Sequence, residues 1–194
     1  DTPHGDPPTM YLNLFALPEN GPEGITPERV YSFRYGNALF IVLDPNLPAK
    51  DQREWLESEL IKGADAKWKF ALYHQPAYSS VVRRDDDEIQ KNWCDLFDRY
   101  HLDMALQGHD HAYLRTPPLK AGKKVSSPAE GTIYVLSVSG TKYYDQDQRE
   151  FTEVGFVKTS TFQTIDIQTA GGDMLTYRAL DIDGKVLDEV VIKK

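Results

Sequence analysis

The stretch Leu106-Gln107-Gly108-His109-Asp110-His111-Ala112-Tyr113 places two histidines directly after a short apolar run. The run 102–106 has the composition of a buried strand, and Gly108 ends it because glycine reaches backbone angles that a side chain forbids. If the segment stays extended, His109 and His111 point the same way, whereas a turn at Gly108 spreads them around one point. Either geometry brings two imidazoles to the carboxyl end of a strand, where sites form in open α/β sheets.

Imidazole is the commonest metal ligand in proteins and suits zinc, iron, manganese and nickel. The alternative interpretation is structural: one histidine caps a backbone carbonyl and the other is solvated. The spacing of His109 and His111 behind a strand and a glycine favours a metal site, although the spacing alone does not decide the question.

Two blocks of this sequence resemble a known family. The run 108–116, Gly-His-Asp-His-Ala-Tyr-Leu-Arg-Thr, is similar to the Gly-His-x-His-x-Tyr-x-Arg-Thr block of calcineurin-like metallophosphoesterases, in their purple acid phosphatase-like branch. The run 70–80 resembles the strand of that branch that is followed by His-x-Pro, here His74-Gln75-Pro76. Segments 17–20, 31–37 and 177–185 also resemble the branch, in the same order along the chain.

The resemblance implies a dinuclear centre that hydrolyses phosphate esters with a metal-bound hydroxide. It assigns His74 and His109 to one metal ion and His111 to the other, with two ions of iron, zinc or manganese as the cofactors. Asp110 lies between two of these ligands and is expected to point away from the metals. Two further histidines are expected to be structural or solvated, namely His4 and His101.

Three blocks of the family are missing from this sequence: Asp-x-His, Gly-Asp-x-x-Asp and Gly-Asn-His-Asp/Glu. They would supply the carboxylates and the asparagine of the centre. We therefore expect residues 1–194 to be one domain, the C-terminal portion of a catalytic domain truncated on its N-terminal side, with Asp1 directly after a lost Gly-Asn-His. The isolated chain should be inactive. Its expected partners are a small phosphate ester and the missing N-terminal half, with self-association as the alternative.

Arg83 and Arg84 stand where purple acid phosphatases often carry a histidine pair, nine and ten residues after the His of His-x-Pro. A guanidinium clamps phosphate with two hydrogen bonds, but it stays charged and cannot donate a proton as a general acid. The two arginines are therefore candidate substrate-binding residues. The equally weighted alternative is that they are solvated or pair with the acidic run 85–87.

Composition sets broad limits on function. The formal net charge is −8, which argues against a nucleic-acid or membrane-surface binder, since both need a basic face. No run approaches the roughly 20 apolar residues of a membrane helix. The single cysteine, Cys94, excludes an internal disulfide and is expected to be a small buried hydrophobic side chain.

The strand and helix signals predict an α/β fold with a C-terminal antiparallel meander, and the resemblance implies that it is part of a four-layer metallophosphoesterase sandwich of mixed β-sheets flanked by helices. Strands are expected at 30–35, 38–43, 68–73, 104–107 and 132–138, and the meander at 159–168, 174–181 and 186–192. Helical turns are expected within 10–17, and full helices at 48–62 and 85–100. Residues 1–8 and 117–130 are expected to be loops, 142–153 polar and mobile, and turns to form at Gly171-Gly172 and Asp183-Gly184.

Two functions from different classes fit this sequence. The first is phosphate-ester hydrolysis by a phosphatase-like enzyme, with a phosphodiesterase as the variant within enzymes. The second is a non-catalytic member of the fold that binds phosphorylated or carbohydrate ligands, which the loss of the histidine pair supports.

Overall fold

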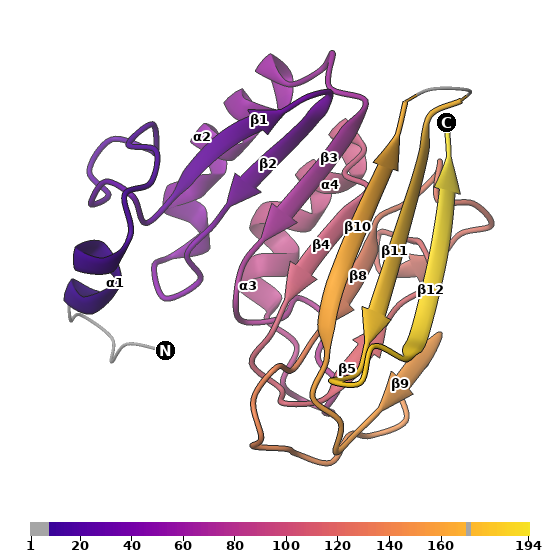
Figure 1. Cartoon of the computed structure of the whole chain (residues 1–194). Helices are drawn as coiled ribbons and strands as arrows, with labels where there is room; N and C mark the ends of the chain where they lie inside the picture. Colours follow the sequence, from indigo (N-terminus) through magenta and orange to yellow (C-terminus); the bar gives the residue numbers. More distant parts are fainter. Residues whose placement is uncertain (1–7, 170–171) are drawn as a thin grey trace.

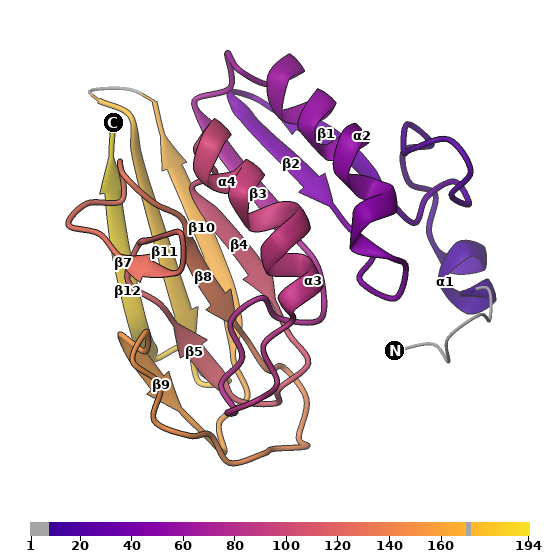
Figure 2. The same ribbon diagram turned by 180° about the vertical axis from the view of Figure 1, so that it is seen from behind.

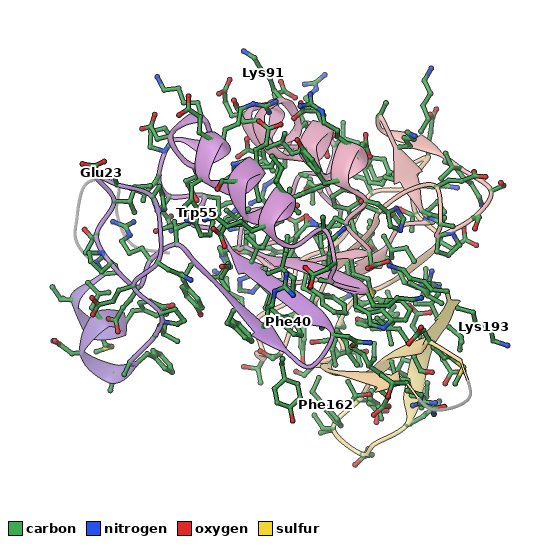
Figure 3. The ribbon with its side chains drawn as sticks, turned by 90° about the horizontal axis from the view of Figure 1, so that it is seen from above. Glu23, Phe40, Trp55, Lys91, Phe162 and Lys193 are labelled. Atoms are coloured by element: carbon green, nitrogen blue, oxygen red, sulfur yellow. The ribbon has the colours of Figure 1, made fainter. Side chains whose placement is uncertain are left out.

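A computed structural model describes residues 8–169 and 172–194 of the chain. A seven-stranded mixed sheet lies between a layer of helices and a three-stranded antiparallel sheet (Figures 1 and 2). Figure 3, seen from above, shows the helices on one side of the large sheet and the C-terminal strands on the other. The predicted α/β class is confirmed, and the predicted loop at residues 1–8 lies almost entirely outside the described residues.

The large sheet has a parallel centre and antiparallel edges. Its strand order is β1-β2-β3-β4-β8-β5-β9, and β2, β3, β4 and β8 run parallel to one another. The strands span Tyr31–Tyr35 (β1), Ala38–Val42 (β2), Trp68–Leu72 (β3), Met104–Gln107 (β4), Tyr113–Arg115 (β5), Ile133–Leu136 (β8) and Val154–Phe156 (β9). Parallel order brings the carboxyl ends of β3 and β4 to one edge, directly before the three predicted ligands.

Helices cover one face of this sheet. They are α2 (Ala49–Lys62) and a continuous helical segment made of α3 (Asp87–Ile89), the π-helical turn η1 (Gln90–Cys94) and α4 (Asp95–Tyr100); a short α1 (Thr9–Leu14) lies apart from them (Figure 2). The predicted helix 85–100 thus begins at Asp87 and contains a π turn. Asp86 caps it, since its carboxylate accepts a hydrogen bond from the Ile89 amide at 3.0 Å.

The core on the helical side is closed by large side chains that contact the sheet. Leu56 and Leu60 of α2 and Trp93 and Phe97 of the second helical segment are fully buried there. Cys94 is 5% exposed, as predicted, and burial raises the pKa of its thiol to about 12. No helix among the described residues is both long enough and apolar enough to span a membrane.

The predicted C-terminal meander is confirmed. Strands β10 (Phe162–Gln168), β11 (Met174–Leu180) and β12 (Val186–Lys193) pair antiparallel and pack on the face of the large sheet opposite the helices. The predicted Asp183-Gly184 turn forms, with Gly184 at φ 80°. The predicted Gly171-Gly172 turn includes Gly171, which lies outside the described residues.

The C-terminal residue closes the far end of the sandwich. The Lys194 ammonium lies 2.6 Å from a carboxylate oxygen of the fully buried Asp103, and it also donates to the Lys67 carbonyl at 2.6 Å. It sits 4.7 Å from the ring centre of Trp68. These contacts join the end of β12 to the chain around the starts of β3 and β4.

Short strands appear where the sequence predicted none. β5 and β9 extend the large sheet, and β6 (Leu119–Lys120) and β7 (Lys123–Lys124) form a small hairpin inside the predicted surface loop 117–130.

The face of β1 and β2 opposite the helices is only partly covered. Phe33, Phe40 and Phe70 stack in a row with ring centres 4.9 Å apart at each step. Phe70 is fully buried under the small sheet, whereas Phe33 is 41% and Tyr35 is 82% exposed. Figure 1 shows that the small sheet ends at β10 and that β1 and β2 extend beyond it. We call Phe33, Tyr35 and Phe40 the aromatic face.

Candidate metal centre

The carboxyl ends of β3 and β4 bring His74 and His109 together. β3 and β4 are neighbouring parallel strands, with Leu72 opposite Leu106. The ladder continues past both strand ends, because the Gly108 amide donates to the His74 carbonyl at 3.0 Å. Each histidine follows its strand by two residues, so both imidazoles reach the same edge of the sheet.

The two imidazoles lie side by side. Nδ1 of His109 is 3.3 Å from Nε2 of His74, with the rings nearly perpendicular at 85°. Two nitrogens held at about 2.0–2.1 Å by one tetrahedral zinc ion are roughly 3.3–3.4 Å apart. The observed separation therefore fits two donors on one ion.

Both rings are tuned to the neutral form that binds metals. The packing around His74 lowers its pKa to about 4, and the nearby His109 adds to the shift. Burial also lowers the pKa of His109, and the charge of the Arg84 guanidinium lowers it further. Neutral imidazole carries the lone pair that a metal ion needs, so at neutral pH neither ring must lose its charge first. Because the Arg84 guanidinium donates to Nε2 of His109, the proton of this ring lies on Nδ1 and must move to Nε2 before Nδ1 can bind a metal.

The absence of a side chain at Gly108 leaves room for the His74 ring. A Cβ at this position would lie 3.3 Å from Nδ1 and 3.6 Å from Cε1 of His74. That is tighter than an ordinary carbon contact, so a side chain here would displace the imidazole. Gly108 thus ends the strand, as predicted from the sequence, and also allows this close approach of the imidazole.

The chain turns sharply through the histidine pair. His109 and His111 both have left-handed backbone angles, with φ 74° and φ 52°. Such angles are uncommon outside glycine and collect at functional sites. Of the two geometries left open by the sequence, the structure adopts the turned one: His109 is directed toward His74, and His111 toward residues 142–144.

His111 is held by a segment far along the chain. Its Nδ1 lies 2.9 Å from the Lys142 carbonyl oxygen, and the Tyr144 amide donates to the His111 carbonyl at 3.2 Å. The Tyr144 ring packs on the imidazole with centres 4.8 Å apart. A carbonyl oxygen only accepts hydrogen bonds, so the Nδ1 of His111 carries the ring proton. The lone pair of this ring is therefore on Nε2, the nitrogen that can bind a metal ion.

Asp110 is a structural anchor. Its carboxylate is fully buried and accepts from the Ser79 hydroxyl at 2.7 Å and from the Ser80 amide and hydroxyl at 2.7 and 2.9 Å. These bonds attach the loop after His74 to the turn between His109 and His111.

Arg84 reaches the candidate centre and Arg83 does not. The Arg84 guanidinium donates to Nε2 of His109 at 3.0 Å and lies 3.9 Å from the Asp110 carboxylate. Arg83 is exposed, with φ 67°. The alternative in which the two arginines pair with the acidic run is not seen within the described residues, where Asp85 forms an ion pair with Arg149.

The remaining predicted residues are placed as follows. His101 ends α4 in a left-handed conformation, and its Nε2 is 3.5 Å from Asp103, away from the centre. His4 lies outside the described residues. Within 8–169 and 172–194, no three His, Cys, Asp or Glu side chains gather closely enough to hold a metal ion. The pair His74 and His109 therefore fits part of a coordination shell and requires further ligands.

The second half of the histidine block is structural. The Tyr113 hydroxyl donates to Asp188 at 2.7 Å, and Arg115 donates to both oxygens of the same carboxylate at 2.6 and 2.9 Å. The Thr116 hydroxyl accepts from the Tyr134 amide at 3.0 Å. These residues fasten β5, which directly follows the turn, to β12 and β8.

The segment 142–149 was missed by the sequence reasoning. It was predicted to be polar and mobile, but the structure ties it to the candidate centre through Lys142, Tyr144, Asp147 and Arg149. Its exposed polar residues follow no periodicity, so the sequence carried no signal for these contacts.

Known proteins similar to this chain include purple acid phosphatases. Purple acid phosphatase 13 of Arabidopsis thaliana is 34% identical over 113 residues, covering 55% of this chain and 21% of its own length. Fe(3+)-Zn(2+) purple acid phosphatase 12 of the same plant is 28% identical over 118 residues, covering 57% of this chain and 25% of its own. The chain thus matches about a quarter of the length of these curated relatives. No protein-family profile matches it.

Solved structures share the fold. Purple acid phosphatase PPD1 from yellow lupin (Lupinus luteus) superposes with a TM-score of 0.72 at 21% identity, covering 84% of this chain and 32% of the lupin chain. GAP50, the anchor in the inner membrane complex of Plasmodium, gives a TM-score of 0.66 at 16% identity, covering 89% of this chain and 56% of its own. The chain therefore has the fold of one part of a purple acid phosphatase. The predicted resemblance to that family is confirmed.

Proposed function

We propose that this chain contributes to metal-dependent hydrolysis of phosphate esters, at a dinuclear centre for which it supplies the C-terminal histidine ligands. The 3.3 Å approach of His74 and His109 at the carboxyl edge of the sheet carries this proposal. Similarity to phosphatases, one of them named an Fe(3+)-Zn(2+) enzyme, supports it.

Each histidine has its own role in the proposed centre. His74 and His109 would hold one ion through Nε2 and Nδ1, and His111 would offer Nε2 to the second ion. Carboxylate and amide ligands would come from outside the described residues. Bound metal ions, of iron, zinc or manganese, would supply Lewis acidity toward the phosphate and activate a water molecule as the nucleophile.

Arg84 is the proposed phosphate clamp of this chain. In the structure its guanidinium donates to Nε2 of His109. A His109 ring that uses Nδ1 as a metal donor keeps its proton on Nε2, which then no longer accepts from Arg84. The guanidinium is thereby released to donate to a phosphate oxygen beside the centre. Arg83 lies farther from the centre and would add positive charge at the entrance.

Metal binding by this chain tests the ligand assignment. Zinc titrated into the pure chain in a calorimeter should bind weakly, because the pair leaves the ion short of donors. His74→Ala should abolish this binding, whereas His101→Ala, a matched histidine away from the centre, should leave it unchanged. Equal binding by all three proteins would contradict the assignment.

Hydrolysis tests the reaction itself. The isolated chain should not turn over an aryl phosphate, whereas the protein as its source organism expresses it should, with activity lost to a chelator and restored by metal. Robust turnover by the isolated chain would show that the missing ligands are not needed. A higher rate on a bis-aryl phosphate than on a mono-aryl phosphate would identify a phosphodiesterase.

A non-catalytic function is the second candidate. Arginine at 83 and 84 removes the side chains that could protonate a leaving group, and the fold is shared with a protein described as an anchor in a membrane complex. In this case the centre would bind a phosphorylated or carbohydrate ligand without hydrolysing it. Phosphate binding by the natural protein without chelator-sensitive hydrolysis would favour this function.

We further propose that the N-terminal half of a longer protein covers the aromatic face. The exposed rings of Phe33 and Tyr35 belong to β1, which extends beyond β10 (Figure 1), and the outer edge of β10 has no neighbouring strand among the described residues. A strand added to that edge would extend the small sheet across β1 and β2, and open edges invite such pairing. Light scattering tests the proposal: the isolated chain should self-associate, and Phe33→Ser with Tyr35→Ser should reduce association. An isolated chain that stays monomeric and unfolds cooperatively would contradict the proposal.

A further inference from the structure

The segment 142–149 contacts both sides of the candidate centre although it forms no helix or strand. At its first end, Lys142 and Tyr144 hold His111 through the carbonyl, the amide and the ring. The Lys142 ammonium lies 5.0 Å from the centre of the Tyr144 ring, which adds a cation–π contact within the segment.

At its second end, the segment holds the loop that carries Arg84. The Asp147 amide donates to the Ser80 carbonyl at 2.9 Å, and its carboxylate accepts from the Val82 amide at 2.8 Å. Arg149 donates to the carbonyls of Ser79 and Val81, both at 2.7 Å, and pairs with Asp85.

We propose that residues 142–149 are a positioning segment that fixes His111 and the Arg84 loop as one unit. The inference rests on the proposed function, in which His111 is a metal ligand and Arg84 binds phosphate. The Lys142 carbonyl selects the tautomer of His111 that presents Nε2, and the Tyr144 ring fixes the plane of the imidazole. Partners of this kind outside the ligand shell orient metal ligands and tune their affinity.

Asp110 completes the unit from the opposite side. It binds Ser79 and Ser80 of the same loop that Arg149 and Asp147 bind, and it lies between the two histidines of the turn. The loop is thus held from two directions, by the turn that carries the ligands and by the segment that orients His111. A change at either end of the segment should be transmitted to the other.

The tautomer of His111 gives a direct test that requires no metal. Long-range proton–nitrogen NMR of the chain at pH 8 should show His111 protonated on Nδ1. Tyr144→Phe keeps the ring and should keep this state. Tyr144→Ala should give a mixture with the Nε2-protonated form. An Nε2-protonated His111 in the unsubstituted chain, or an unchanged tautomer in Tyr144→Ala, would overturn the proposal.

Coupling between the two ends is tested by hydrogen exchange. Arg149→Ala should accelerate exchange of the Val82 amide roughly tenfold, the loss expected for about one hydrogen bond. It should also broaden or shift the His111 signals, which lie at the other end of the segment. Arg149→Lys, which retains one charged donor, should restore much of the protection. If Arg149→Ala accelerates exchange of the Val82 amide but leaves the His111 signals unchanged, the coupling is refuted.

These outcomes are separable from failure of the proposed function. Tautomer and exchange are read in the metal-free chain, so they test positioning alone. A chain that binds no zinc but shows the coupled response would retain the positioning segment and reject the metal centre.

Discussion

Replacing Asp188 with alanine should destabilise the chain more than most single substitutions. The carboxylate is 4% exposed on β12 and accepts one hydrogen bond from Tyr113 and two from Arg115. The alanine variant leaves a guanidinium that is 10% exposed without its acceptor, and a buried phenol with only the Tyr177 hydroxyl at 3.3 Å as a partner. Both groups lie at the junction between the two sheets, so water cannot replace the carboxylate without opening that junction.

The magnitude follows from the cost of an uncompensated buried charge. Removing one partner of a buried ion pair typically costs about 3–5 kcal/mol, which is a large part of the roughly 5–15 kcal/mol that stabilises a domain. For a chain of this size each kcal/mol lowers the melting temperature by about 2–4 °C, so a loss of roughly 6–20 °C is expected. The three hydrogen bonds act on one carboxylate, and their separate costs should not be added.

Urea denaturation of the variant and of a matched control provides the assay. Glu189→Ala removes the next residue of the same strand, whose pairing with Arg178 is exposed, 45% on the glutamate side. An exposed pair contributes about 0–1 kcal/mol, so this control should unfold close to the unsubstituted chain. Equal midpoints for Asp188→Ala and Glu189→Ala would refute the reasoning, because burial would then not distinguish the two pairs.

Three further predictions concern glycine, pH and the C-terminus. Gly108→Ala should weaken zinc binding about tenfold in calorimetry by displacing the imidazole beside it, whereas Gly140→Ala, whose Cβ would meet nothing within 4 Å, should have no effect. Burial raises the pKa of Asp188, but its hydrogen bonds outweigh that effect and hold the pKa below the usual value. Its stabilising contribution is therefore present above about pH 4 and is lost as the pH falls further. The difference in free energy of unfolding between the unsubstituted chain and Asp188→Asn, measured in urea, should therefore disappear in acid. Deleting Lys194 removes the ammonium from the buried Asp103 carboxylate and should cost about 1–3 kcal/mol in the same assay.

The layers of the fold were readable from the sequence because their signals are strong. The apolar strands β2 and β3, the helix α2 and the C-terminal meander each bury a regular pattern of side chains, and pattern is what sequence reasoning detects. The strands β5 and β9 have three residues each, too few to establish a period. The π turn η1 was also not predicted, because one extra residue per turn hardly changes the pattern of buried side chains along the helix.

The candidate centre was predictable only where position along a strand decides it. His74 and His109 each follow a parallel strand, so the topology alone brings them to one edge. The divergence of His109 from His111 depends on two left-handed residues within one turn, a conformation that stays uncommon even for histidine, which adopts it more often than most side chains. The contact of Tyr144 with His111 joins residues more than thirty positions apart and has no local signature.

The block 108–116 shows why a motif match does not assign roles to its residues. Gly108 and the two histidines act at the edge of the sheet, where the backbone turns. The chain then enters β5, and side chains two apart on a strand share a face. Tyr113 and Arg115 therefore point together to Asp188 on β12, and their place in the motif follows from anchoring rather than chemistry. A turn built from left-handed histidines costs free energy, and a strand fastened directly behind it offsets that cost. The ligand half of the block thus depends on its structural half, and loss of Asp188 should disturb His111 before it unfolds the chain.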